Sequence, residues 1–248
     1  MKKTSYLSRV AAQARPVRRT AMAAALLGAL SAPALAVVAV PVDTGAQVVI
    51  SQVYGGGGNT GAKYKNDYIE LFNRSDVAVN IGGWSVQYAS ATGGTWQKTP
   101  IPAGVVLQPG QYYLVQEGAG TGGTDNLPAP DAFGALNLSG STGKVALVNS
   151  GTLLSGVSPA VASFVDLIGF GGANYFEGSA AAPVLSNTTA ALRAADGCTD
   201  TNNNSSDFST AAPAPRNTST ASHACSAPAA PYRCHLPGQP VAGRGRGR

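Results

Sequence analysis

Apolar and polar residues alternate in short runs along much of the chain, and Gly, Pro and Asn separate the runs. The clearest example is NDYIELFNRSDVAVNIGGWSV at residues 66–86. Residues 68–72 have the composition of a half-buried strand, a polar turn follows at 73–76, and Trp84 and Val86 resume the alternation after two glycines. This period of two residues predicts β-strands with one face toward a core. We expect Trp84 to anchor that core.

Other runs of this kind predict further strands, and the pattern is lost after residue 170. Small and polar residues dominate residues 171–215, where only residues 190–195 indicate a single helical turn. A series of strands spaced roughly 8–12 residues apart is typical of an antiparallel β-sandwich. The additional strands are expected at residues 47–54, 95–99, 105–107, 111–116, 144–149 and 162–170.

Four stretches carry a resemblance to a known family: VVISQVYGGGGN, KNDYIELFNRS, GWSVQYAS and GCTDTNNNSSDFSTAAPAPRN, at residues 48–59, 65–75, 83–90 and 197–217. They resemble the lamin-tail domain, which is known from nuclear lamins and from exported bacterial proteins. The resemblance implies an all-β, immunoglobulin-like antiparallel β-sandwich with long Gly/Asn/Ala-rich loops over residues 47–225. In exported bacterial proteins such a module often precedes a nuclease domain of the endonuclease/exonuclease/phosphatase type.

The two ends of the chain differ from this middle part. Residues 1–36 hold six basic residues, no acidic residue, an apolar stretch at 21–30 and the small-residue site Ala-Leu-Ala at 34–36, which are typical of a signal peptide. Residues 37–46 are expected to be a linker. Residues 226–248 form a Pro/Gly/Arg-rich segment that we predict to be disordered, and it is either a native basic tail or a frameshift product.

A signal peptide predicts export to the periplasm, the medium or the cell surface. The pair Arg18 and Arg19 leaves both Sec and twin-arginine export open. Beyond this segment, the sequence contains no stretch of 18 or more apolar residues, so we expect no membrane span.

The formal net charge of +5 comes from the two ends of the chain. Six of the 17 Lys and Arg residues lie in residues 1–36, and four more lie in residues 226–248. Residues 37–231 hold 7 basic and 12 acidic residues. The folded part therefore lacks the basic surface that nucleic-acid binding requires.

The sequence offers no catalytic constellation. It contains no H-E-x-x-H motif and no G-x-S-x-G elbow, and both histidines, His223 and His235, lie near the C-terminal end. Asp67, Glu70 and Asp166 are single acids on different predicted strands, and we expect them to face solvent. The chain is therefore predicted not to be an enzyme.

Gly56, Gly58 and Gly61 match the pattern G-x-G-x-x-G. A dinucleotide site of that kind needs a helix directly after the glycines, whereas a strand is expected here. We therefore predict a flexible hairpin loop at residues 55–58.

One polar stretch has the spacing of a calcium loop. Carboxylate and amide oxygens at every second residue can converge on one cation, and such oxygens suit Ca²⁺. The final Gly and Glu positions of an EF-hand loop are missing, so an ordinary polar turn stays open as the alternative. The candidate ligands are Asp200, Asn202, Asn204 and Asp207.

The chain has three cysteines. Cys198 and Cys225 fall within the part that resembles the lamin-tail domain, whereas Cys234 lies in the C-terminal segment, so we predict a disulfide between the first two. A bridge that closes the loop from Cys198 to Cys225 contributes roughly 3–4 kcal/mol to the stability of the folded state by the loop-entropy estimate. A disulfide agrees with export into an oxidising compartment.

These observations predict an exported, non-catalytic binding or targeting module with an unknown protein or polymer as its ligand. Two alternatives stay open. In the first alternative, the chain is a truncated or frameshifted fragment of a secreted nuclease that lacks its catalytic domain. In the second, it is a structural or adhesive surface protein. The sequence does not specify the oligomeric state.

Overall fold

The computed structural model describes residues 46–225. The predicted signal peptide, residues 37–45 of the predicted linker and the C-terminal tail lie outside the described residues. Among the described residues, no helix is both long enough and apolar enough to cross a bilayer.

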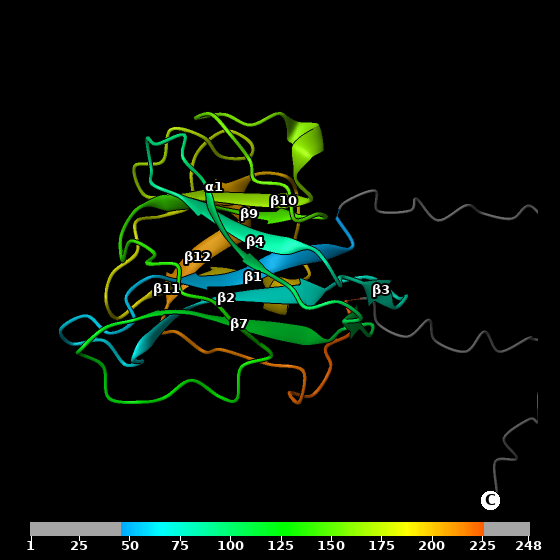
Figure 1. Ribbon diagram of the computed structural model, residues 1–248, viewed down its shortest axis with the longest axis horizontal. Coiled ribbons are helices and arrows are strands. Elements are labelled where there is room, and N and C mark those ends of the chain that lie inside the picture. The colour runs from blue at the N-terminus through cyan, green and yellow to red at the C-terminus, as the bar shows by residue number, and fades with distance from the viewer. Residues whose placement is uncertain (1–45, 226–248) are drawn as a thin grey trace, which may run out of the picture. The chain divides into compact units, whose positions relative to one another are not determined.

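Two β-sheets face each other across the core (Figure 1). The strands of the described residues pair antiparallel, except in the short pairing of β7 with β8. The structure thereby confirms the predicted all-β, immunoglobulin-like antiparallel β-sandwich. The first sheet has the order β12 (Phe208–Ala211), β11 (Ala190–Arg193), β1 (Val48–Tyr54), β2 (Asn66–Asn73), β7 (Tyr112–Ala119) and β8 (Ala132–Phe133); the second has the order β10 (Asp166–Phe170), β9 (Gly143–Val148), β4 (Ser85–Ala89) and β5 (Gln97–Pro100); β3 (Val79–Asn80) and β6 (Val106–Leu107) form a separate pair.

Three short helical turns complete the secondary structure of the described residues. They are η1 (Val161–Ser163), η2 (Ala195–Gly197) and α1 (Asn204–Asp207). The helical turn predicted at residues 190–195 is wrong for its first part, because Ala190–Arg193 is strand β11. This short Ala-rich segment has little strand preference of its own, and its pairing with β1 on one side and β12 on the other makes it a strand.

The main core lies between the two sheets and follows the predicted alternation with one interruption. On β1, Val48, Ile50 and Val53 all belong to the main core cluster. The spacing changes from two residues to three because the β1–β2 register shifts between Ile50 and Gln52. A bulge of this kind inserts one residue and turns the following side chains to the opposite face.

The six-stranded sheet is also apolar on its other face, where Tyr54, Tyr68 and Leu114 form one cluster and Phe72 and Tyr112 form another. This explains why all seven residues of β1 are buried. Part of the cover comes from residues 212–225, which we call the strap.

The two tryptophans lie in different places. Trp84, the expected core anchor, is half-buried and packs against the main core from its rim. Trp96 is buried in a separate cluster that includes Ala146 and Leu154, and its indole Nε1 donates to Gly156 O at 3.0 Å.

The glycines at residues 55–58 lie in the connection between the paired antiparallel strands β1 and β2, so the predicted hairpin is confirmed. They are buried, however, and the expectation of a flexible loop is wrong. A Cβ atom at Gly57 would lie 1.9 Å from the backbone carbon of Asn66, and one at Gly58 would lie 2.1 Å from the backbone nitrogen of Gly120. Glycine is needed at these positions because neighbouring backbone segments approach too closely for any side chain. In this loop the backbone thus packs directly against the backbones of neighbouring segments.

Candidate functional site

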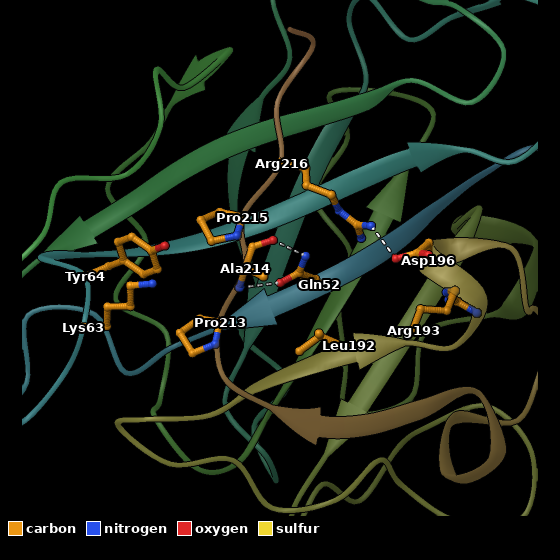
Figure 2. Close-up of a pocket in the computed structure, with 10 residues that line it drawn as sticks. All are labelled: Gln52, Lys63, Tyr64, Leu192, Arg193, Asp196, Pro213, Ala214, Pro215 and Arg216. Atoms are coloured by element: carbon orange, nitrogen blue, oxygen red, sulfur yellow. Dashed lines mark hydrogen bonds and ion pairs between the residues drawn. The ribbon is translucent and has the colours of Figure 1, made fainter. Parts of the chain in front are cut away.

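A groove of about 490 Å³ opens on the outer face of the six-stranded sheet (Figure 2). Its floor comes from β1 and β11, and residues 213–216 of the strap form one wall. Lys63 and Tyr64 contribute one end of the groove and Asp196 the other (Figure 2). The strap thus turns a flat sheet face into a hollow.

The strap is fixed to the floor of the groove by a glutamine side chain. Gln52 Nε2 donates to Ala214 O at 2.8 Å, and Ala214 N donates back to Gln52 Oε1 at 3.3 Å. The same amide also donates to Glu70 Oε2 at 3.1 Å and accepts from the Tyr68 hydroxyl at 2.9 Å. The Gln52 amide thus both donates to and accepts from the Ala214 backbone, as a residue of a neighbouring β-strand would.

An ion pair with a fully buried carboxylate holds Arg216, two residues further along the strap. The Arg216 guanidinium lies 2.9 Å from Glu70 Oε1, and the Arg216 backbone N–H donates to Glu70 Oε2 at 2.6 Å. Ser51 Oγ also donates to Glu70 Oε1, at 2.6 Å. Burial raises the pKa of Glu70, and the neighbouring guanidinium opposes that rise.

Arg216 connects the strap to the groove rim through an aromatic ring. Its guanidinium carbon lies 3.8 Å above the centre of the Tyr112 ring, and Nη1 donates to the Tyr112 hydroxyl at 2.9 Å and to Asp196 Oδ1 at 3.0 Å. Burial raises the pKa of Tyr112 to about 12, so its hydroxyl stays protonated near neutral pH. Three side chains therefore act as one unit at this end of the groove.

The rim at Asp196 has an unusual backbone. Ala195 and Asp196 have φ angles of 51° and 56°, in the left-handed region that non-glycine residues rarely adopt. The Tyr112 hydroxyl donates to Asp196 O at 2.9 Å, and this bond together with the Arg216 contact holds the conformation. The Asp196 side chain remains 63% exposed at the rim. Strained backbone of this kind concentrates at functional sites.

Below the groove a second arginine is fully buried. Arg193 Nη2 lies 2.9 and 2.7 Å from the two carboxylate oxygens of Asp166, and Arg193 Nε donates to Ile50 O at 2.8 Å. Asp166 Oδ2 also accepts from Ile50 N at 2.6 Å. Burial raises the pKa of Asp166, whereas Arg193 lowers it. This pair joins β10 of one sheet to β11 and β1 of the other.

The three acids that we expected to face solvent are all buried, and that expectation is wrong. Asp67, Glu70 and Asp166 are 4%, 0% and 2% exposed. Alternation alone misplaces Asp67 and Glu70 because bulges shift the phase of β1 and β2 and because the six-stranded sheet is covered on both faces. Asp166 lies on β10 of the other sheet and is buried because it faces Arg193 and the Ile50 backbone across the core. Each acid has a dedicated set of hydrogen-bond donors, as buried carboxylates require.

The calcium candidates do not converge on one point. Asp200 and Asp207 both face Arg193, with oxygen to Nη1 distances of 3.3 and 3.6 Å. Asn204 is buried and its Oδ1 accepts from Gly169 N at 2.8 Å, whereas Asn202 is exposed. In residues 46–225 no group of three or more His, Cys, Asp or Glu side chains is arranged to hold a metal ion. Arg193 therefore competes with a calcium ion for Asp200 and Asp207, and this geometry favours the alternative of an ordinary polar turn.

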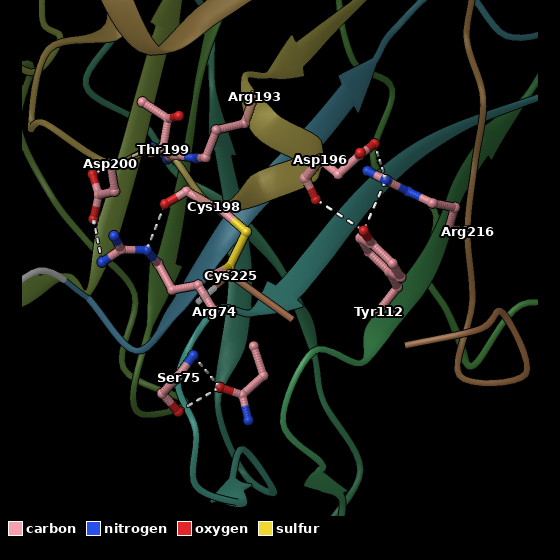
Figure 3. The surroundings of a disulfide bond; sticks show 11 residues. Arg74, Ser75, Tyr112, Arg193, Asp196, Cys198, Thr199, Asp200, Arg216 and Cys225 are labelled. Carbon is pink, nitrogen blue, oxygen red and sulfur yellow. Dashed lines mark hydrogen bonds and ion pairs between the residues drawn. A yellow bond between two sulfur atoms is a disulfide. The ribbon is translucent and has the colours of Figure 1, made fainter. Parts of the chain in front are cut away.

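The predicted disulfide between Cys198 and Cys225 is present, with a Cα–Cα distance of 5.3 Å (Figure 3). It fastens the last described residue of the strap to the segment that follows η2. Arg74 Nε donates to Cys198 O at 3.0 Å, and Arg74 Nη1 lies 4.0 Å from Asp200 Oδ2 (Figure 3). Cys234 lies outside the described residues.

The sequence alone did not indicate Arg193, Arg216 or Gln52 as site residues. For Arg193 the sequence did contain a signal, because Arg193 is the single charged residue in the Ala-rich stretch AALRAA. If that stretch is buried, the arginine needs an acidic partner. The strap gave no signal, because it has no apolar periodicity.

Residues 41–160 match the family model described as the Lamin Tail Domain. The match supports a lamin tail domain in this part of the chain and agrees with the resemblance seen in the sequence. Strands β1 to β9 lie within it. The lamin tail domain match ends before β10, β11, β12 and the strap, so the groove combines residues from the matched part with residues beyond it.

The structure is also similar to the crystal structure at 2.50 Å resolution of a DUF4876 family protein from Bacteroides thetaiotaomicron VPI-5482. The sequence identity is 10%, the TM-score is 0.48, and the similarity covers 72% of this chain and 74% of that chain. A likeness this distant does not bear on function. The sequence has no significant match among curated proteins.

Proposed function

We propose that this protein is an exported, non-catalytic binding module whose protein or polymer ligand occupies the groove beside the strap. The observation that carries the proposal is the rim of this groove, where two consecutive non-glycine residues are held in left-handed conformations next to Arg216. Such strain persists only where surrounding contacts enforce it, and it is typical of binding sites.

The lining of the groove favours an extended ligand with both apolar and charged groups. Tyr64, Leu192 and the strap prolines supply apolar contact area. Lys63 is exposed at one end, where its Nζ lies 5.1 Å from the centre of the Tyr64 ring, and the exposed Asp196 carboxylate lies at the other end. Charges of opposite sign at the two ends give a ligand a preferred direction.

A role without catalysis is supported by the partners of the charged groups around the groove. Arg193 and Arg216 are bound to buried carboxylates, and Glu70 and Asp166 are held by those same arginines. Groups fixed in this way stabilise the domain and are not free to exchange protons with a substrate. The disulfide supports an exported location, because disulfides persist in oxidising compartments.

The test is binding of the chain from residue 37 onward to an array of defined polysaccharides and of 12-residue peptides. We expect Lys63→Glu and Asp196→Lys to weaken binding of the selected probe at least tenfold. Lys65→Glu is the matched control, because Lys65 is exposed two residues away and does not line the groove. Equal binding by all three variants would place the ligand elsewhere.

The two alternatives give different outcomes. Metal-dependent cleavage of plasmid DNA by the pure protein, abolished by substitution of one acid, would contradict a role without catalysis. An adhesive role would give self-association or surface retention that the groove variants leave unchanged. The nucleotide sequence after the codon for Cys225 tests the fragment hypothesis, which expects nuclease residues to be encoded in another reading frame.

A further inference from the structure

Residues 134–139, which we call the plug segment, cross one end of the sandwich and contact both sheets. Two of its side chains, Leu136 and Leu138, belong to the main core cluster. Its backbone donates from Gly134 N to Gln116 O of β7 at 2.8 Å and from Ser139 N to the Tyr88 hydroxyl of β4 at 3.1 Å. The plug segment therefore lies as an extended chain between β7 and the second sheet.

Between these two contacts, Gly118 N of β7 donates to Leu136 O at 2.8 Å, whereas the backbone N–H groups of Leu136 and Leu138 are bound by carboxylates. Leu136 N donates to Glu117 Oε2 and Leu138 N donates to Asp67 Oδ2, both at 2.9 Å. Asp67 Oδ1 also accepts from Gly57 N at 2.9 Å, and Glu117 Oε2 accepts from the Thr99 hydroxyl at 2.9 Å. Two acids on adjacent strands thus clamp the same segment.

Both acids are buried without a cation. Asp67 and Glu117 are 4% and 1% exposed, and no described Lys, Arg or His forms an ion pair with either one. Glu117 Oε1 is buried and has no hydrogen-bond partner. The β2–β7 register shifts between Asn66 and Tyr68, which places Asp67 in an irregular part of the ladder beside Glu117.

The remaining groups that face these acids are neutral near pH 7. Tyr54 and Tyr88 are the titratable ones, and both lie close enough for Asp67 to raise their pKa values. Burial raises the pKa of Asp67 to about 7, and the nearby Glu117 carboxyl raises it further. Burial likewise raises the pKa of Glu117 to about 7. In both cases, hydrogen bonds from backbone N–H groups of the plug segment act in the opposite direction.

We propose that Asp67 and Glu117 form a pH-controlled latch that holds the plug segment in place in acidic solution and releases it as the solution becomes alkaline. An acid that binds its proton more tightly when folded contributes stability that is fully present below its unfolded pKa, near 4. That contribution is lost as the pH rises through about 7, the folded pKa of both acids. Two neighbouring anions in an apolar interior then gain hydration when the plug segment moves away.

Hydrogen–deuterium exchange of the chain from residue 37 onward at pH 6 and pH 8.5 tests this latch, after correction for intrinsic exchange rates. We expect the Leu136 and Leu138 amides to lose at least tenfold protection at pH 8.5, while the central amides of Ile69 and Val115 keep theirs. Equal protection of the plug segment at both pH values would overturn the proposal. Simultaneous loss of protection in all strands would overturn it too, because that is global unfolding.

Neutral side chains of the same shape separate the latch from a general pH effect. The double variant Asp67→Asn and Glu117→Gln should show no pH dependence in the plug segment, whereas Asp131→Asn should keep it. Asp131 is the matched control, since its carboxylate also accepts a backbone N–H, that of Leu114, but it is half-exposed. A pH response that survives in the double variant would contradict the proposal.

Carbon-13 carboxyl titration of the wild-type protein covers the case in which the double variant does not fold. The resonances of Asp67 and Glu117 should titrate over the same pH range as the exchange of the plug segment. Titration of both acids near pH 4 would overturn the latch without any variant.

Discussion

Arg193 and Asp166 meet inside the sandwich with two oxygen to Nη2 contacts of 2.9 and 2.7 Å, and their side chains are 0% and 2% exposed. The pair lies where β10 of one sheet approaches β1 of the other, and both residues also bond to the Ile50 backbone. It therefore ties the two sheets together through one guanidinium.

Removing one partner of this pair should be costly. Arg193→Met leaves Asp166, Asp200 and Asp207 around a site that has lost its cation, and an uncompensated buried charge costs about 3–5 kcal/mol. We expect the free energy of unfolding, measured in urea at pH 7, to fall by about that amount. Lys65→Met, at an exposed position, should change it by less than about 0.5 kcal/mol. Similar losses in both variants would mean that the buried pair is not a special source of stability.

The disulfide should stabilise the strap. Replacing Cys198 and Cys225 by Ser removes the bridge that joins the strap to the segment after η2, and we expect the free energy of unfolding to fall by about 2–4 kcal/mol. Peptide mapping without reduction should show Cys198 linked to Cys225 and Cys234 unpaired. A link between Cys225 and Cys234 would contradict the pairing, and an unchanged urea midpoint in the double Ser variant would contradict its energetic role.

Stability should also depend on Glu177. Burial, and secondarily the Asp166 carboxylate, raises the pKa of Glu177 to about 8. Its folded pKa lies above the unfolded value, so its stabilising contribution is present at low pH and is lost as the pH rises through about 8. The melting temperature should therefore fall between pH 6 and pH 9, and by less in Glu177→Gln. Asp125→Asn, an exposed acid, should show the wild-type slope.

The left-handed rim residue offers a stabilising substitution. Ala195 has a φ of 51°, which costs a residue with a Cβ about 1–2 kcal/mol relative to glycine. Ala195→Gly should remove this strain, but glycine also gains conformational freedom in the unfolded chain, which offsets part of the benefit. We therefore expect the free energy of unfolding to rise by about 0.5–1 kcal/mol. Ala194→Gly is the control, since φ there is −60° and the same change should destabilise the protein. Equal effects at both positions would remove the strain argument.

The calcium prediction can be tested directly by calorimetric titration. Because Asp200 and Asp207 already face the Arg193 guanidinium, we expect no heat of binding with millimolar Ca²⁺. Binding that weakens after Asp200→Ala would show that calcium displaces the arginine and would restore the site predicted from the sequence.

Much of the sandwich could be predicted because its longer strands alternate apolar and polar residues. Residues 47–54 were predicted as a strand, and β1 is Val48–Tyr54. The strands that the sequence did not predict are β8, which has two residues, and β11 and β12, which have four residues each and are rich in Ala, Ser and Thr. The conformation of β11 and β12 depends on pairing with β1 and with each other, and a local pattern cannot show such pairing.

The candidate site was harder to predict than the fold. Glu70 pairs with Arg216 across 146 positions of sequence, so no spacing rule could join them. The two acids that hold the plug segment could not be recognised as buried, because a bulge where β2 pairs with β7 moves side chains from one face of a strand to the other. The cysteine pair could be predicted because two of the three cysteines fall in the part of the sequence that resembles the lamin-tail domain.

The disulfide also determines how the domain carries mechanical load. A pulling force applied beyond Cys225 passes through the sulfur bridge to Cys198 and from there toward β11. Residues 199–224 lie outside this path, so the bridge shields the strap and its wall of the groove from direct tension. The wall that the strap contributes to the groove is therefore spared direct tension, whereas the floor on β1 and β11 lies within the path of the force.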